Sequence, residues 1–464
     1  MGWFGTTLGI MGGIARGATA ASLWTGNQIY TGLQNARTKR EVRALYQHAS
    51  EANFQNRAVA ALPEISKQQL LLTSGEPDDN DIYDYQSKSN TAGLDFIWGT
   101  TDSPNSMIVS GGRNEDRVCA LIPFVHKAQA ENITVIVFHS GNRQLEKMIK
   151  SHSRDYEFIS NSNSFYDAFR SMPVDDIAYL LYETMPDDVA SPAAESLLRA
   201  LIEVLLITEG KITLQTLSTF PLINLKKTID GLKISDQLSN DEYDEINHYC
   251  MAGSSETDAV RIFLNRLNRQ SENVYGKPKN NFSNIKRMMN YNGVVAIDVG
   301  TSSNDLLVSL IINHFLLLQS QGKEFVVLID NIPVSRYSKF SELLRGQIFA
   351  ISNQDFVSSL HGGEQNGDEL FAEITGNVGT LVLFRHSSGT SCQKWSEHLG
   401  KYKKIRIRYN ISQSKAFMNS NNSRGLSVDE TDEPRVRAET IGKLGDGIAC
   451  THSVDGTLFA EIKE

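Results

Sequence analysis

Short, almost wholly apolar runs recur along this chain and are separated by stretches with helical spacing. The clearest run is ITVIVF at Ile133–Phe138. A strand buried on both faces of a parallel sheet has such a continuous apolar pattern. Other runs predict strands at Phe96–Gly99, at Met107–Val109, in VVAIDV after Gly293, in FVVLID ending at Asp330, at Ile348–Ser352 and at Thr380–Phe384. Helices are predicted between them, as at Cys119–Ala130 and Asn304–Ser320, and this alternation predicts βαβ units with right-handed crossovers.

The middle of the chain has a different pattern. Residues 174–290 contain AESLLRALIEVLL, LQTLSTFPLINLKKTI and DAVRIFLNRLNRQ, all with helical spacing, and few strand candidates. The predicted fold class is therefore α/β. A parallel sheet is expected from residues 95–185 and 291–410, with an all-α insertion domain at 186–290.

The two ends lack this alternation. Residues 1–34 form a Gly-rich apolar segment, which we interpret as membrane-associated or partner-docking; Arg16 interrupts its apolar run before the roughly 20 residues of a spanning helix are reached. Residues 35–94 predict a helical region followed by an acidic linker, and residues 411–464 predict a polar C-terminal tail.

Composition narrows the class of protein. The chain has 464 residues, 40% of them hydrophobic and 21% charged, which is typical of globular domains. Its formal net charge of −9 argues against non-specific wrapping of nucleic acid over most of the surface. The four cysteines form no C-x-x-C pair and the histidines no H-E-x-x-H motif, so no metal site is predicted.

The segment MIVSGGRNEDRVCALIP, from Met107 to Pro123, has the outline of a phosphate-binding loop. In a working loop, G-x-x-x-x-G-K-[ST], backbone amides surround the phosphates, the Lys reaches their oxygens and the hydroxyl holds Mg²⁺. Here two carboxylates stand where they would repel a triphosphate. The degenerate loop comprises Ser110, Gly111, Gly112, Arg113, Asn114, Glu115, Asp116 and Arg117.

The order of these segments resembles the type IV coupling proteins, the TraD/TraG-like branch of the FtsK/HerA superfamily of P-loop ATPases. The resemblance covers roughly residues 95–460. AAESLLRALIEVLL resembles the start of the family's all-α domain, and FVVLIDNIP resembles its Walker B strand. His139, Ser140, Gly141 and Asn142 replace the family's Asp-Pro-Lys-Gly turn. The fold that this implies is a RecA-like P-loop NTPase sheet with an inserted all-α domain.

The resemblance also implies roles for single residues. Asp330 matches the Walker B Asp, Asn331 replaces the catalytic Glu, Gln354 matches a sensor-like Gln, and Arg385 marks one of the last strands. Asp330 also has a plain interpretation as a strand-end residue that caps a turn, and Gln354 as a surface residue. In Lys401–Tyr409 (KYKKIRIRY), alternate basic residues indicate either a charged edge strand or a strip that faces an acidic partner or nucleic acid.

The departures from the family point to a lost activity. Aligned on Ile122-Pro123, Asp116 occupies the Lys position and Arg117 the hydroxyl position, while Asn331 replaces the residue that orients water. One hypothesis is a pseudo-ATPase that needs no cofactor and serves as scaffold or substrate receptor in a type IV secretion or conjugative DNA-transfer system. The alternative is an active DNA or protein translocase that uses ATP with Mg²⁺ through a non-standard P-loop or a partner-completed site. A third is an α/β resemblance alone.

The resemblance implies partners and a location as well. Expected partners are other type IV secretion or conjugation proteins, including a catalytically competent coupling-protein paralogue, and a DNA or effector substrate. Membrane contact is expected through residues 1–33. The implied location is the bacterial cytoplasm, at the cytoplasmic face of the inner membrane.

Overall fold

The computed structural model describes residues 39–57, 59–61, 84–85, 105–277, 282–283, 285–300, 304–334, 338–361, 366–416, 419–453 and 456–462. The predictions for residues 1–34, for the strand at Phe96–Gly99 and for most of the linker lie outside these residues. The chain divides into two units: Met1–Pro123 with Ser352–Ser359 and Phe371–Glu464, and Phe124–Ile351 with Leu360–Leu370. None of the helices in the described segments has the length and apolar character that crossing a bilayer requires.

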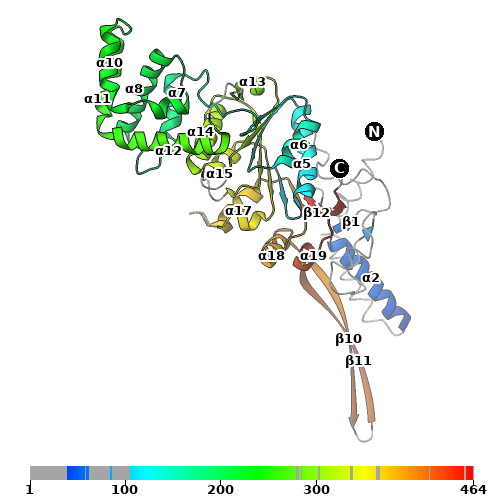
Figure 1. The fold of residues 1–464 in the computed structure, drawn as a ribbon. Helices are drawn as coiled ribbons and strands as arrows, with labels where there is room; N and C mark the ends of the chain where they lie inside the picture. Colours follow the sequence, from blue (N-terminus) through cyan, green and yellow to red (C-terminus); the bar gives the residue numbers. More distant parts are fainter. Residues whose placement is uncertain are drawn as a thin grey trace. The chain divides into compact units, whose positions relative to one another are not determined.

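The second unit contains the buried strands that the sequence predicts over residues 133–138, 294–299, 325–330 and 348–352, and a half-buried strand at Tyr156–Ile159 that it does not predict (Figure 1). Their order is β8-β7-β4-β6-β5, and β4 pairs in parallel with both β6 and β7. Each residue of β4 and β7 is buried, which explains the continuous apolar runs. The strands are β4 (Thr134–His139), β5 (Tyr156–Ile159), β6 (Val294–Asp298), β7 (Phe325–Asp330) and β8 (Phe349–Asn353).

Helices of the same unit pack on these strands. α14 (Asp305–Ser320) and α15 (Ser338–Arg345) contact each other, and the Phe138 ring of β4 meets Phe315 and Phe340 edge-on, with ring centroids 5.6 and 5.4 Å apart. Such edge-to-face pairs stabilise a core beyond the area they bury. α6 (Arg143–His152) follows β4 directly.

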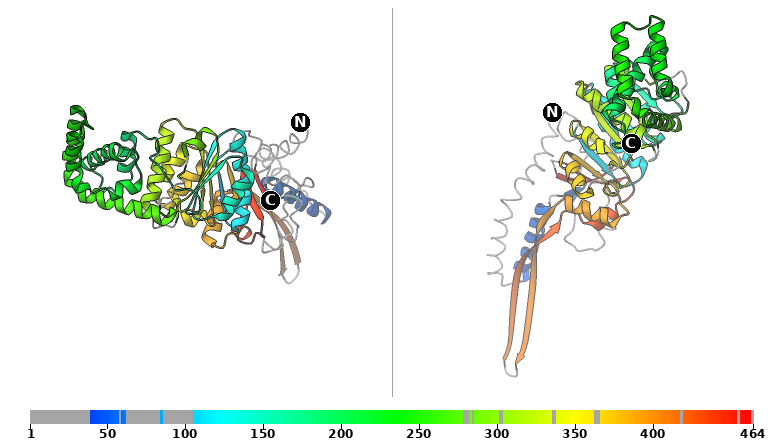
Figure 2. Two further views of the ribbon diagram at one scale, coloured as in Figure 1. Left: turned by 45° about the horizontal axis from the view of Figure 1, so that its top comes forward. Right: turned by 90° about the vertical axis from the view of Figure 1, so that its left-hand side faces the viewer.

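A block of helices separates β5 from β6, as predicted. It contains α7 (Val174–Tyr182), α8 (Pro192–Glu209), α9 (Leu214–Thr219), α10 (Leu225–Ile234), α11 (Asn240–Ala252), α12 (Thr257–Tyr275) and α13 (Ile285–Asn290). α8 begins with Ser191 as its cap and ends at Gly210, whose φ is +66°. Figure 2 shows most of these helices grouped as a green lobe. The predicted α/β class with a helical insertion is confirmed; the exact domain boundaries stay a prediction.

Within the first unit the strand order is β2-β1-β13-β12-β9-β3, and β8 contributes residues to both units. β3 and β9 are parallel, whereas β12 is antiparallel to both β9 and β13. The helices α16 (Phe356–Ser359), α18 (Gly389–His398) and α19 (Ala438–Gly442) belong to the first unit, while α5 (Asn114–Ala130) and α17 (Gly367–Gly376) have residues in both units. The strands of the first unit are β1 (Val59–Ala61), β2 (Asp84–Tyr85), β3 (Met107–Ser110), β9 (Thr380–Leu383), β12 (Ile448–Ser453) and β13 (Gly456–Glu461).

A long antiparallel ribbon occupies much of the segment expected as a polar tail. β10 (Lys401–Ala416) pairs with β11 (Asn419–Pro434) from end to end, and α2 (Lys39–Arg57) lies along its base (Figure 2). Asn53 of α2 acts like a neighbouring strand: its Nδ2 donates to Ile405 O at 2.9 Å, and Ile405 N–H donates to its Oδ1 at 2.6 Å. Residues 411–464 therefore contain the rest of this ribbon, α19, β12 and β13.

Within the ribbon, basic residues of the Lys401–Tyr409 segment form ion pairs with an acidic residue. Lys404 and Arg406 both form ion pairs with Glu433, and Lys404 is 7% exposed. Burial alone would raise the pKa of Glu433, but the hydrogen bond from Arg406 and the charge of Lys404 lower it overall. For these two residues the arrangement favours a structural role.

We predict that His314 makes the second unit acid-sensitive. Its Nδ1 lies 2.8 Å from Tyr166 Oη, and burial lowers its pKa to about 4. The unfolded chain, with a pKa near 6.5, binds this proton first, so the contribution of neutral His314 to stability is complete above pH ~6.5 and is lost as the pH falls towards ~4. The expected loss at pH 5 is about 2 kcal/mol.

Urea unfolding at pH 7 and pH 5 measures this loss. His314→Asn keeps an acceptor for the Tyr166 hydroxyl but cannot titrate, so its stability difference between the two pH values should shrink by about 2 kcal/mol. An unchanged difference would show that His314 is not the group responsible. Some acid sensitivity should remain in the variant, because burial also lowers the pKa of His452 to about 4.

Candidate functional site

The turn between β3 and α5 is much shorter than a phosphate-binding loop. Ser110 ends β3, only Gly111, Gly112 and Arg113 follow, and α5 begins at Asn114. In the P-loop motif, four residues separate the two glycines; here the glycines are adjacent. Four of the eight residues expected in the loop, Asn114, Glu115, Asp116 and Arg117, are instead the first turn of α5.

Both glycine amides of the turn are used within the protein. Gly111 N–H donates to Asn353 O at 3.1 Å, and Gly112 N–H donates to Arg385 O at 2.8 Å. Both residues have positive φ, +88° and +65°. A Cβ on Gly111 would lie 2.7 Å from Phe384 O, so no other residue fits there without movement. The turn is packed against the segment that follows β9, and these two amides do not face a ligand.

Asp116 provides the negative charge at the start of α5. Its carboxylate accepts hydrogen bonds from the Arg113 backbone N–H at 3.2 Å and from the Arg113 guanidinium at 3.3 Å, and the residue is 7% exposed. The hydrogen bond with Asp116 raises the pKa of Arg113. The first turn of a helix favours an anion, because its amides lack partners and its dipole is positive there. In this protein that anion is a side chain of the chain itself.

Arg117 binds the turn from the other side. Its Nη1 donates to Gly112 O at 3.0 Å and to Gly111 O at 3.3 Å, and the residue is 3% exposed. A guanidinium is a donor only, so it cannot ligate Mg²⁺ as the hydroxyl of a working loop does. Glu115 is exposed.

Two other residues implied by the family resemblance lie in the same unit. Arg385 is about half exposed and pairs with Asp446 at 3.2 Å; Asp446 lies 3.7 Å from Arg113 as well. Ion pairs this exposed contribute little to stability. Gln354 lies in the exposed turn after β8. The structure therefore brings Arg385 next to the degenerate turn through its carbonyl and through Asp446, and places Gln354 at the surface.

Sequence reasoning missed a buried partner of Ser110. The Ser110 hydroxyl accepts from Phe356 N–H at 3.1 Å and lies 2.8 Å from His386 Nε2, while His386 Nδ1 lies 2.8 Å from Phe384 O. Burial lowers the pKa of His386, which favours a neutral ring that donates from Nδ1 and accepts at Nε2. Both side chains are buried, so the pair anchors the turn and is not a nucleophile open to substrate. The sequence feature that could have indicated this pair is a histidine just after an apolar strand.

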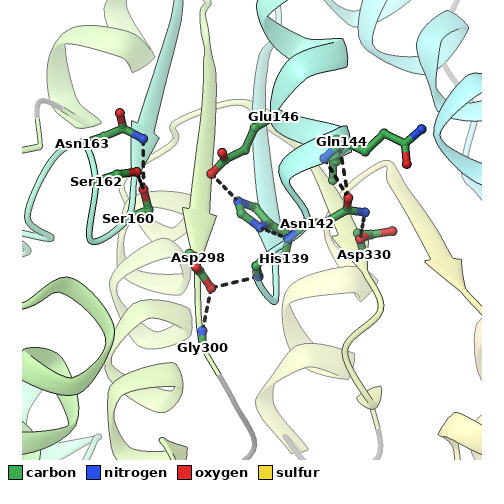
Figure 3. Close-up of polar contacts among 12 residues, drawn as sticks. His139, Asn142, Gln144, Glu146, Ser160, Ser162, Asn163, Asp298, Gly300 and Asp330 are labelled. Carbon is green, nitrogen blue, oxygen red and sulfur yellow. Dashed lines mark hydrogen bonds and ion pairs between the residues drawn. The ribbon is translucent and has the colours of Figure 1, made fainter. Parts of the chain in front are cut away.

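The Walker B-like residue belongs to the second unit. Asp330 ends β7, is fully buried, and accepts a hydrogen bond of 2.7 Å from Asn142 Nδ2 (Figure 3). Asn331 follows with φ +58°, a conformation that Asn tolerates better than most residues. The register sets His139 of β4 beside both Asp330 and Asp298, so three polar side chains lie at the carboxyl ends of three adjacent strands.

Asn142 organises this edge of the sheet. Its backbone N–H donates to His139 Nδ1 at 3.2 Å, and its Oδ1 caps α6 by accepting from Gln144 and Leu145 amides at 3.2 and 3.1 Å. Asp298 is held by Gly141 N–H at 3.1 Å and Gly300 N–H at 2.9 Å (Figure 3). Several internal hydrogen bonds therefore hold the turn His139–Asn142, although the buried His139 Nε2 has no hydrogen-bond partner among the described residues.

His139 is kept neutral in this setting. Burial lowers its pKa, although Asp298 and Asp330 act in the opposite direction. Its Nδ1 accepts a hydrogen bond, so the ring proton resides on Nε2, 3.7 Å from Glu146 Oε1. A metal ion at Nε2 would have to displace that proton. Within the described residues, no group of three or more His, Cys, Asp or Glu side chains could hold a metal ion.

Comparisons with known proteins show the fold. No protein-family model and no curated protein matches the chain. The plasmid coupling protein TrwB, in complex with a non-hydrolysable ATP analogue, superposes with a TM-score of 0.50 at 14% identity, over 78% of this chain and 87% of that one. The chain is similar in fold to TrwB.

Two further solved structures are more distant. TrwB with ADP and Mg²⁺ gives a TM-score of 0.49 at 13% identity, over 78% of this chain and 85% of that one. VirB4 of Thermoanaerobacter pseudethanolicus gives 0.44 at 10% identity, over 79% and 92%.

We predict that Asn142 contributes to stability through three of its atoms at once. Asn142→Ala should destabilise the protein by about 2 kcal/mol or more, because it removes the α6 cap and the partner of buried Asp330. Asn142→Ser keeps a capping oxygen and should lose less. Chemical denaturation of the two variants checks this order; equal losses would show that the cap contributes nothing.

Proposed function

We propose that this chain is a non-hydrolysing, coupling-protein-like component of a type IV secretion or conjugative DNA-transfer system, in which it acts as scaffold or substrate receptor. The TrwB-like fold supports the class. The single observation that supports a lost activity concerns the turn between β3 and α5. There Asp116 accepts hydrogen bonds from the Arg113 backbone N–H and guanidinium.

Electrostatics oppose nucleotide at this turn. A phosphate at the start of α5 would meet the Asp116 carboxylate, and two like charges 4 Å apart repel by about 4 kcal/mol near a protein surface. A P-loop reverses that sign with its Lys. Moving Asp116 aside would also break its hydrogen bonds with Arg113, and the three-residue turn supplies no further amides in their place.

The residues of this chain do not fit a nucleotide with Mg²⁺. Arg117 replaces the hydroxyl ligand and donates to the turn's own carbonyls. One oxygen of Asp330 accepts from the Asn142 amide. Asn331 carries an amide, which cannot accept a proton from water as a carboxylate can. Hydrolysis therefore lacks its ligand and its general base.

The proposed role depends on the surfaces of the protein. Partners would be other secretion or conjugation proteins, among them a catalytically competent coupling-protein paralogue, and a DNA or effector substrate. The proposed location is the cytoplasmic face of the inner membrane of a bacterium, with residues 1–33 as the segment that reaches the membrane or the channel.

We predict no micromolar binding of ATP. Isothermal titration calorimetry of the full chain with ATP and Mg²⁺ should show no saturable heat. The double variant Asp116→Lys, Arg117→Thr restores the chemical groups of the motif but not its length, and should also fail to bind. Micromolar binding by the natural chain would contradict the proposal; binding by the double variant alone would show that charge, and not the length of the turn, prevents it.

We predict that transfer depends on recruitment and not on Asp330. In a cell with its own secretion or conjugation system, deleting residues 1–33 should abolish recruitment and transfer, because that segment provides the attachment. Asp330→Asn keeps the size and an acceptor for Asn142, and should leave both unchanged. Transfer lost in Asp330→Asn, with normal folding by circular dichroism, would support an active translocase instead.

A further inference from the structure

A cavity of about 380 Å³ lies in the second unit among α7, α14 and α15. α14 contacts both other helices (Figure 1). Its walls include Leu316 and Leu317 of α14, which are apolar, and Tyr179 of α7, which is 50% exposed. The cavity therefore has an aromatic face and an aliphatic floor.

Gln319 and Glu342 each bring a side-chain acceptor to this cavity. Gln319 Oε1 is buried and has no hydrogen-bond partner within the described residues. An unmet buried acceptor lowers the stability of the fold, so its position needs a reason. Glu342 is exposed on the cavity wall and forms no ion pair in the described part of the chain. Both groups can accept a hydrogen bond from a donor group of a ligand.

Two donors of the cavity, on Lys339 and Asn313, are already engaged. Lys339 Nζ binds Glu183 through the carboxylate at 2.9 Å and the backbone carbonyl at 3.1 Å. Asn313 Nδ2 donates to the same carbonyl at 2.9 Å and to Thr184 Oγ1 at 3.1 Å. After these contacts, the remaining charge in the cavity is that of Glu342, which is negative.

The charges that act on the Tyr179 phenol are negative as well. Burial raises the pKa of its phenol, and the charges of Glu183 and Glu342 raise it further. The hydroxyl is therefore protonated at neutral pH.

We propose that this cavity binds the guanidinium group of an arginine side chain that a partner protein presents. A guanidinium has five donors and a flat face, so it can serve Gln319 and Glu342 while it stacks on Tyr179. The aliphatic stem of arginine fits against Leu316 and Leu317. An ammonium has no flat face to stack, and an anion would be repelled by Glu342.

The inference goes beyond the proposed function and does not depend on it. None of the lining residues belongs to the β3–α5 turn or to the edge around Asp330. An arginine pocket is a contact that a protein substrate or an assembly partner can use, whether or not the chain hydrolyses ATP.

The test uses N-acetyl-arginine amide as probe and N-acetyl-citrulline amide as its neutral match. The full chain, labelled at leucine methyls, should show saturable shifts of Leu316 and Leu317 with the arginine probe. The citrulline probe should bind at least tenfold more weakly, because it lacks the charge. No saturable shifts, or equal shifts with both probes, would overturn the proposal.

Variants locate the site. Glu342→Gln should weaken binding at least fivefold, whereas Glu195→Gln, an exposed carboxylate of α8 outside the cavity, should not change it. Gln319→Leu should weaken binding and raise the melting temperature, because it removes an acceptor that is unmet without ligand. A variant Gln319→Leu that melts lower and binds normally would show that Gln319 has a structural role only, and the proposal would fail.

Discussion

The hydrogen bonds between Asp116 and Arg113 determine how the start of α5 can be used. A helix N-terminus needs an anion or a capping acceptor, and the P-loop fold makes that need available to a phosphate. Here a carboxylate from the same turn meets it, and a buried guanidinium neutralises the carbonyls behind it. Hydrogen bonds within the chain therefore hold the strand–turn–helix geometry at this point.

At the end of β7, too, a charged side chain has a hydrogen-bond partner within the chain. Asp330 retains its position on a buried strand, but an amide of Asn142 donates to its carboxylate. In both places the group that a charged ligand would contact is satisfied by a neighbour in the chain.

Much of the fold could be predicted because buried parallel strands must be apolar on both faces. ITVIVF and FVVLID each correspond to a strand within one residue. The start of β10 could be predicted as a strand, because basic and apolar residues alternate over Lys401–Tyr409. Its pairing with β11 could not, because β11 is largely polar and lacks such alternation. Asp116 was identified as a misplaced charge, but its true role needed the helix boundary: Glu115 and Asp116 favour the first turn of a helix, so α5 begins earlier than the apolar spacing indicates. His386 and Asn142 act through contacts with residues far away in sequence, which no local pattern contains.

The ribbon of β10 and β11 has a mechanical consequence. Sixteen residues in an extended strand span about 50 Å, at roughly 3.3 Å per residue. α2 holds only its base, where Asn53 pairs with the backbone of Ile405. A lever of this length converts a rotation of about 10° at its fulcrum into a displacement of about 9 Å at the far end. A small change in the angle between α2 and β10 would therefore move the far end of the ribbon by about the width of a helix.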